Sequence, residues 1–304
     1  MIWKASDCMA DKELRGVFSV LITPMTQDFQ IDEKGFRANL DWQIARGIGG
    51  LCVVGSTGEF VSLTKEERNR VAKIAVEHVA GRVPVVVGTA AATTPEVIEY
   101  TRYAESIGAD AAMIINPYYC LPAPNEVIEF FRMVGEAVSI PIMAYNNPAT
   151  SGVDILPETM AEIAKIKNIS YLKDASGEIR RVREIQQCTR NQIKIFNGCE
   201  DLAFEAFVLG AVGWICVAGN VIPGECQKLY ELVDAGKISE AKKLYDHILP
   251  FLVHIEQCGK LVQVTKAAAA KVGCAAGPAR YPRLPLTPEE DQALDAVLRQ
   301  IGAI

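Results

Sequence analysis

The strongest constraint in this sequence is an alternation, repeated eight times, between a short β-branched apolar run and a longer amphipathic stretch. Each apolar run is closed by turn residues before the amphipathic stretch begins, which is the pattern of a strand followed by a helix. The strands are predicted at residues 17–23, 50–54, 83–87, 111–115, 141–145, 169–173, 193–197 and 213–217. The helices between them are predicted at residues 33–46, 65–79, 95–107, 125–138, 157–166, 178–187, 202–209 and 223–235.

Most of the predicted strands are apolar throughout, as in strands that helices cover on both faces. Eight such units predict an α/β fold, a closed (β/α)8 TIM barrel. An open sheet that binds a dinucleotide would need a glycine-rich turn after the first strand, and Leu21-Ile22-Thr23-Pro24 has none. Three further helical patterns follow at residues 239–256, 260–271 and 288–301. The expected organisation is a loose N-terminal leader at 1–15, the barrel at 16–235 and a C-terminal helical appendage at 236–304.

The composition limits what such a barrel can bind. The net charge is −6 with acidic and basic residues interspersed, so there is no basic surface for nucleic acid. No segment approaches the roughly 18 apolar residues of a membrane helix, and the nine cysteines are scattered without a C-x-x-C pair. With only three histidines, this pattern argues against a zinc site and favours free thiols. We therefore expect a cytoplasmic protein without a metal or other cofactor, whose partner is a small molecule.

One lysine stands at a strand end, where TIM barrels carry their chemistry. Lys173 closes the sixth apolar run, and the small residues Ala175, Ser176 and Gly177 follow it. An arbitrary lysine is most often a solvated surface residue. An amine at the tip of a buried strand is instead poorly solvated, so we expect a lowered pKa and a nucleophilic role for Lys173.

Two other strand ends carry residues that fit such a lysine. The turn after the second strand reads Gly55-Ser56-Thr57-Gly58-Glu59. Its glycines can adopt positive φ and its hydroxyls flank exposed N–H groups, so it could bind a carboxylate, although ordinary βα turns contain the same residues. Tyr118 and Tyr119 follow the fourth strand and Tyr145 ends the fifth. A tyrosine is most often a core residue, but three near one lysine favour a proton relay.

The last two strand ends give weaker candidates. Gly198 and Glu200 follow the seventh strand, where an acidic first turn also complements the helix dipole whatever the function. Ile215 lies within the eighth strand and fits the barrel core. A barrel that handles phosphate would need a glycine-rich phosphate loop near these two strands, and the acidic sequence there disfavours it.

These motifs resemble those of the dihydrodipicolinate synthase and N-acetylneuraminate lyase family of class I aldolase-type enzymes. The resemblance rests on the Gly55 to Glu59 turn, on Tyr145-Asn146 with Pro148 and Gly152, and on Leu172-Lys173-Asp174-Ala175-Ser176-Gly177. It implies that Lys173 forms a Schiff base and that Tyr145 carries protons over it.

The resemblance also implies roles for the remaining candidates. Ser56 and Thr57, in the turn that begins at Gly55, would hold the carboxylate of a 2-oxo acid, and Thr57 would share the proton relay. Tyr119 would complete the relay of a neighbouring subunit in a homotetramer built as a dimer of dimers. The carbonyl group of Ile215 would face the substrate.

Two departures from the family patterns narrow the expected substrate. Thr150 stands where the synthases have an arginine for their second substrate, and Ala175 stands where the sialic acid lyases have a threonine. We therefore expect a catabolic lyase that acts on a small hydroxylated 2-oxo acid, such as a 2-keto-3-deoxy sugar acid or pyrroline-4-hydroxy-2-carboxylate. The alternatives are a 4-hydroxy-tetrahydrodipicolinate synthase and a non-catalytic 2-oxo acid-binding paralogue. The choice between aldol chemistry, dehydration and deamination depends on the pocket around Thr150, Glu200 and Asp201.

Overall fold

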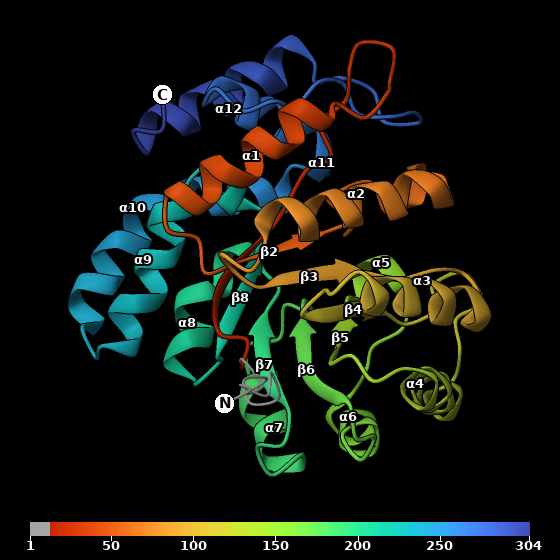
Figure 1. Cartoon of the computed structure of the whole chain (residues 1–304). Coiled ribbons are helices and arrows are strands. Elements are labelled where there is room, and N and C mark those ends of the chain that lie inside the picture. Colours follow the sequence, from red (N-terminus) through yellow and green to blue (C-terminus); the bar gives the residue numbers. More distant parts are fainter. Residues whose placement is uncertain (1–12) are drawn as a thin grey trace, which may run out of the picture.

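A closed barrel of eight parallel strands, paired in sequence order, forms the centre of the computed structural model, which describes residues 13–304 (Figure 1). The first strand pairs with both the second and the eighth, which closes the ring. The predicted (β/α)8 barrel is therefore confirmed. The strands are β1 (Gly16–Val20), β2 (Gly50–Val53), β3 (Val85–Gly88), β4 (Ala111–Ile115), β5 (Ile142–Asn146), β6 (Ile169–Asp174), β7 (Lys194–Asn197) and β8 (Gly213–Cys216).

Helices surround the barrel, and three more follow it (Figure 1). Those that alternate with the strands are α1 (Glu33–Ala45), α2 (Lys65–Val79), α3 (Thr94–Ser106), α4 (Pro124–Ala137), α6 (Pro157–Ile163), α7 (Arg181–Cys188), α8 (Ala203–Val208) and α9 (Pro223–Asp234). The appended helices are α10 (Ile238–Gln257), α11 (Leu261–Lys271) and α12 (Pro288–Gln300), as expected. Four short turns of helix were not predicted: η1 (Phe60–Ser62), α5 (Pro148–Ser151), η2 (Glu200–Leu202) and η3 (Ala218–Asn220).

The expected N-terminal leader lies largely outside the described residues. Its last part is not loose: Leu14 is buried, and its N–H donates a hydrogen bond to the Tyr171 hydroxyl at 3.0 Å.

Aromatic rings fill the lower part of the barrel. Phe18 and Tyr171 each pack edge-on against Phe196, with ring centroids 5.5 and 6.0 Å apart. Glycines make room for these rings, because a Cβ atom added at Gly50 would lie 2.3 Å from Phe18 and one at Gly213 would lie 2.2 Å from Phe196. The interior of the barrel below its carboxyl end is therefore filled by packed side chains.

A buried ion pair ties the C-terminal helices to the loop that follows β2. The Glu59 side chain is fully buried, and its carboxylate lies 2.6 Å from the Lys266 amine of α11. The Arg280 N–H donates to the same carboxylate at 2.8 Å, and Lys266 also donates to the Pro278 carbonyl group. In Figure 1 the appended helices α11 and α12 lie beside α1 at one end of the molecule. The C-terminal region therefore holds the end of the Gly55 to Glu59 turn in place.

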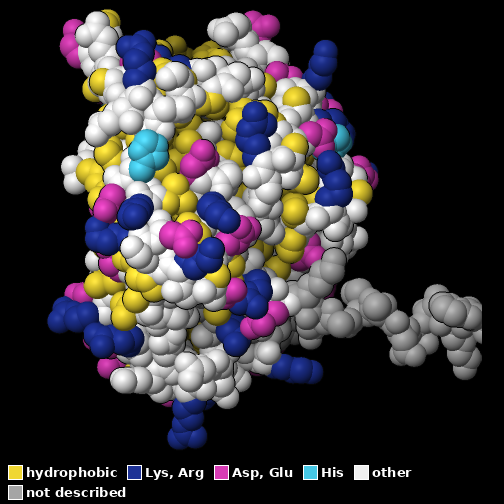
Figure 2. All heavy atoms as spheres, turned by 90° about the vertical axis from the view of Figure 1, so that its left-hand side faces the viewer, with side chains coloured by type: hydrophobic (Ala, Val, Ile, Leu, Met, Phe, Trp, Pro, Cys, Tyr) yellow, Lys and Arg dark blue, Asp and Glu magenta, His cyan; other side chains and the backbone are white. Residues whose placement is uncertain are grey.

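The surface is mixed in charge. On the face in Figure 2, basic and acidic side chains are interspersed, with no continuous patch of one sign. Within residues 13–304, no helix is both long and apolar enough to cross a membrane. The same residues contain no group of His, Cys, Asp and Glu side chains that could hold a metal ion.

The ion pair of Glu59 generates a stability prediction. Lys266→Met should lower the free energy of unfolding by roughly 3 to 5 kcal/mol, because it leaves a buried carboxylate without its nearest cation. Lys271→Met is the matched control on the same helix: Lys271 pairs with the partly exposed Asp291 and Asp295. Loss of these outer pairs should cost less than about 1 kcal/mol. Urea unfolding of the two variants tests this, and equal losses would contradict it.

Candidate active site

Lys173 and Tyr145 meet at the carboxyl end of the barrel. They are register partners on the adjacent strands β6 and β5, and each is 6% exposed. The Lys173 Nζ atom lies over the face of the Tyr145 ring, 4.2 Å from its centroid. A cation over an aromatic face is attracted by the ring quadrupole. The strand pairing thus places the predicted nucleophile and the predicted proton carrier in direct contact.

The prediction that the pKa of Lys173 is lowered is wrong. Burial does lower the pKa of this amine, as predicted, but Tyr145, Cys52 and Glu200 act on the amine and raise the pKa by more. The net pKa is raised above the usual value of a lysine. The amine therefore carries a proton in the ligand-free protein and must lose it before it can act as a nucleophile.

The turn after β2 has a different backbone from the predicted one. Gly55 and Gly58 are not in the left-handed region; Val54 and Glu59 on either side are, with φ of +59° and +62°. Positive φ is strained for a β-branched residue, and such strain clusters at functional sites. The glycines provide space instead, because a Cβ atom at Gly55 would lie 2.8 Å from the Val20 side chain.

Ser56 and Thr57 lie between these strained positions, Ser56 half-buried and Thr57 buried. Cys52 connects this turn with the lysine: its sulfur lies 4.0 Å from the position of a Cβ atom at Gly55, and its thiol influences the pKa of Lys173. Burial raises the pKa of the Cys52 thiol to about 12. Sequence reasoning missed Cys52, although it lies on the strand that leads into the turn.

In the structure, Gly198 and Glu200 contact other groups of the protein. A Cβ atom at Gly198 would lie 2.9 Å from the Cε atom of Lys173, so this glycine makes room for the lysine side chain. The buried Glu200 carboxylate accepts the N–H groups of Val217 and Ala218 at 2.7 and 3.0 Å. Burial raises its pKa to about 8. Glu200 thereby joins the loop after β7 to the loop after β8.

A polar network that sequence reasoning missed braces the ends of β5 and β6. The buried Asn146 amide donates to Asp154 and Asp174, both at 2.9 Å, and its oxygen accepts the Ile155 N–H. Asp154 pairs in turn with Arg181 at 2.7 Å. Asn146 belongs to the Tyr145-Asn146 motif, but its contacts could not be predicted, because its partners lie 8 and 28 residues away, beyond any local pattern.

The three remaining candidates differ in how exposed they are. Tyr119 is 91% exposed, so this chain alone does not bring it to Tyr145. Thr150 is exposed and belongs to the short helix α5. Ile215 is fully buried in β8, opposite Phe18 of β1.

A further missed residue, Asn147, contacts the site directly. Its side-chain amide donates a hydrogen bond to the Tyr145 hydroxyl at 2.8 Å. An asparagine before a proline is common in turns, so nothing in the sequence distinguishes it.

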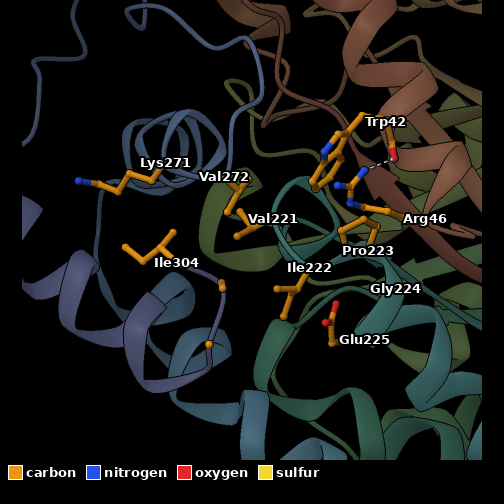
Figure 3. Close-up of a pocket in the computed structure, with 12 residues that line it drawn as sticks. Trp42, Arg46, Val221, Ile222, Pro223, Gly224, Glu225, Lys271, Val272 and Ile304 are labelled. Atoms are coloured by element: carbon orange, nitrogen blue, oxygen red, sulfur yellow. Dashed lines mark hydrogen bonds between the residues drawn. The ribbon is translucent and has the colours of Figure 1, made fainter.

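A hollow of about 500 Å³ lies elsewhere on the surface (Figure 3). Trp42 of α1 and Arg46, the C-cap residue of this helix, line it together with Ile222, Lys271 and the C-terminal Ile304. None of the candidate residues lines this hollow, so we place the chemistry at Lys173 and not there.

Comparison with known proteins agrees with this geometry. Residues 13–301 match the model of the dihydrodipicolinate synthetase family. The 4-hydroxy-tetrahydrodipicolinate synthase of Bartonella bacilliformis is 36% identical over 295 residues, which cover 96% of this chain and 99% of the relative. The enzyme of the same name from Methanothrix thermoacetophila is 36% identical over 289 residues, which cover 95% and 97% of the two chains.

Solved structures show the same relationship. The dihydrodipicolinate synthase of Acinetobacter baumannii, solved in complex with pyruvate, matches with a TM-score of 0.92 and 30% identity over 96% of this chain and all of that chain. The 4-hydroxy-tetrahydrodipicolinate synthase of Methylacidiphilum fumariolicum matches with a TM-score of 0.92 and 30% identity over 95% and 96% of the chains. With the family match over nearly its whole length, the chain belongs to the dihydrodipicolinate synthetase family and is an enzyme of the Schiff-base lyase type.

Proposed function

We propose that this enzyme is a lyase for a small hydroxylated 2-oxo acid and that Lys173 forms the Schiff base. The observation that carries this proposal is the contact of the buried Lys173 amine with the face of Tyr145, at the end of the barrel that also holds the strained Ser56-Thr57 turn. In this proposal Ser56 and Thr57 bind the carboxylate of the substrate. The ketone carbon is then presented to the amine.

The first steps need a proton carrier. The Lys173 ammonium group transfers a proton to the Tyr145 oxygen as the phenol passes its own proton on, so the neutral amine can attack the C2 carbonyl carbon. The C–N bond forms, the carbonyl oxygen takes up a proton, and a carbinolamine results. The carbinolamine nitrogen gives up a second proton, which Tyr145 passes to the hydroxyl group; this group leaves as water and a protonated imine remains. The ammonium and the ketone thus yield one iminium and one water.

The iminium is an electron sink for the neighbouring carbon. If the C3–C4 bond breaks, the products are pyruvate bound as an enamine and an aldehyde. If C3 instead loses a proton and a C4 substituent leaves, the reaction is a dehydration or a deamination. A 2-keto-3-deoxy sugar acid or pyrroline-4-hydroxy-2-carboxylate would suit this chemistry. Support comes from α5, whose sequence Pro-Ala-Thr-Ser offers no cation for a second carboxylate.

A second candidate function is that of a 4-hydroxy-tetrahydrodipicolinate synthase. The names of the relatives favour it, at 36% identity over almost the full length. In that reaction the pyruvate enamine would attack an aldehyde substrate that carries its own carboxylate. Thr150 is the feature against it, because a hydroxyl group binds a carboxylate less strongly than a guanidinium group does.

We also propose a cytoplasmic homotetramer built as a dimer of dimers. Tyr119 is 91% exposed and Leu121 is 60% exposed on the loop after β4. Exposed apolar side chains of this size mark contact surfaces when they lie together. In a dimer formed through this loop, Tyr119 would enter the proton relay of the neighbouring subunit.

A panel of substrates separates the two functions. We expect the highest kcat/KM on a 2-keto-3-deoxy sugar acid or on pyrroline-4-hydroxy-2-carboxylate, and poor condensation of pyruvate with aspartate semialdehyde. Thr150→Arg should raise only the condensation, by roughly tenfold to a hundredfold, because it adds a charged hydrogen bond of about 1.5 to 3 kcal/mol. If the unmodified enzyme is most efficient in the condensation, the second function is right.

Covalent trapping tests the role of Lys173. Borohydride reduction in the presence of pyruvate should attach the reduced adduct to the peptide that contains Lys173, as mass spectrometry will show. Lys173→Ala should abolish trapping and turnover. Lys194→Ala is the matched control, since Lys194 lies on the adjacent strand β7 with a partly exposed side chain paired to Glu13. An adduct on another lysine, or an active Lys173→Ala variant, would refute the proposal.

The raised pKa of Lys173 predicts the pH dependence of adduct formation. Because a raised pKa keeps the amine protonated to higher pH, the neutral fraction and the rate should both rise with pH between about 6 and 9. Glu200 is among the groups that raise this pKa, but its own pKa is raised to about 8, so it carries charge only above that pH and Glu200→Gln should raise the rate only in the upper part of the range. Quenched-flow trapping with pyruvate measures both profiles. A rate that stays constant over this range would mean that the amine is already neutral.

A further inference from the structure

The hydrogen bond between Asn147 and Tyr145 has a fixed direction. A side-chain amide has one acceptor atom and one donor group, and its orientation has to be deduced from the neighbours. Here the Oδ1 atom of Asn147 faces the Thr150 N–H at 3.1 Å, and a backbone N–H can only donate. The NH2 group must therefore face the Tyr145 hydroxyl, 2.8 Å away, and donate to it.

This direction determines where the phenol hydrogen can lie. The hydrogen of a phenol prefers the ring plane, which offers two positions on either side of the oxygen. A donor occupies the side toward Asn147, so the Tyr145 hydrogen takes the other side and stays available for a second partner. The same donor faces the negative charge that develops on the oxygen when this proton leaves.

The short helix α5 holds Asn147 in this orientation. Asn147 is the N-cap residue of α5, and its carbonyl group accepts the Ser151 N–H and hydroxyl at 2.9 Å each. The amide oxygen caps the helix while the amide nitrogen contacts the tyrosine. One side chain therefore connects the conformation of the loop after β5 to the hydroxyl that lies beside Lys173.

We propose that Asn147 is a positioning residue that directs the Tyr145 proton toward the substrate bound at Lys173. This inference rests on the proposed function, in which Tyr145 carries the protons of the Schiff-base reaction. Asn147 itself exchanges no proton with the substrate; it acts through the tyrosine. The end of β5 thus supplies the proton carrier, and the loop that follows it supplies the group that orients this carrier.

Proton exchange at the methyl group of pyruvate in deuterated water tests this role, because it measures the imine–enamine proton transfer without the true substrate. Asn147→Asp keeps the cap but turns a donor into an acceptor, which would draw the phenol hydrogen toward the loop. We expect exchange to slow by roughly 10²-fold or more, within the range that a positioned acid–base group contributes. Asn147→Ser also keeps a cap and only removes the donor, so it should cost less, roughly tenfold.

Ser151→Ala is the control for loop structure, since it removes a different hydrogen bond to α5 and leaves the Asn147 amide in place. It should exchange like the unmodified enzyme. Borohydride trapping at equilibrium should still label Lys173 in all three variants. Equal losses in all three, or unchanged exchange in Asn147→Asp, would overturn the role of Asn147. Failure of the unmodified enzyme to trap pyruvate would instead refute the Schiff-base function.

Discussion

A buried ammonium group has to be stabilised by its surroundings, and the surroundings of Lys173 organise this end of the barrel. The face of Tyr145 lies against the amine, Glu200 and Cys52 raise its pKa, and Gly198 leaves space for its methylene groups. These groups come from β2, from β5 and from the loop after β7. In the proposed reaction the Tyr145 phenol takes the proton from the amine, so the group that stabilises the ammonium ion would also accept its proton.

Most of the fold could be predicted because apolar runs and amphipathic stretches are local signals. All eight strands lie within a few residues of their predicted positions. The differences have non-local causes. The first strand ends before Ile22, whose N–H donates to the Asn220 side chain at 3.1 Å in place of a neighbouring strand. The helix predicted from residue 178 begins at Arg181, since the Glu178 N–H is bonded to the Ser176 hydroxyl.

The candidate site was predictable in residue type but not in electrostatics. A motif identifies Lys173 and Tyr145, but the sign of the lysine pKa shift depends on how burial balances against the nearby Tyr145, Cys52 and Glu200, and no sequence pattern gives their distances from the amine. The glycines of the turn after β2 were expected to adopt unusual backbone angles, and they serve as gaps in the packing instead. The contact of Asn147 with Tyr145 is not predictable from the sequence, because it arises from a four-residue helix that the Asn147 side chain itself caps.

The ion pair between Glu59 and Lys266 joins segments more than 200 residues apart in the sequence, one beside the Ser56-Thr57 turn and the other in α11. Regions that share a buried ion pair open together, because neither can be exposed without leaving a charge unpaired in the interior. The Ser56-Thr57 turn and the C-terminal helices should therefore form one cooperative unit in native-state hydrogen exchange. Substitutions in the C-terminal helices that disturb this ion pair should then also loosen the Ser56-Thr57 turn.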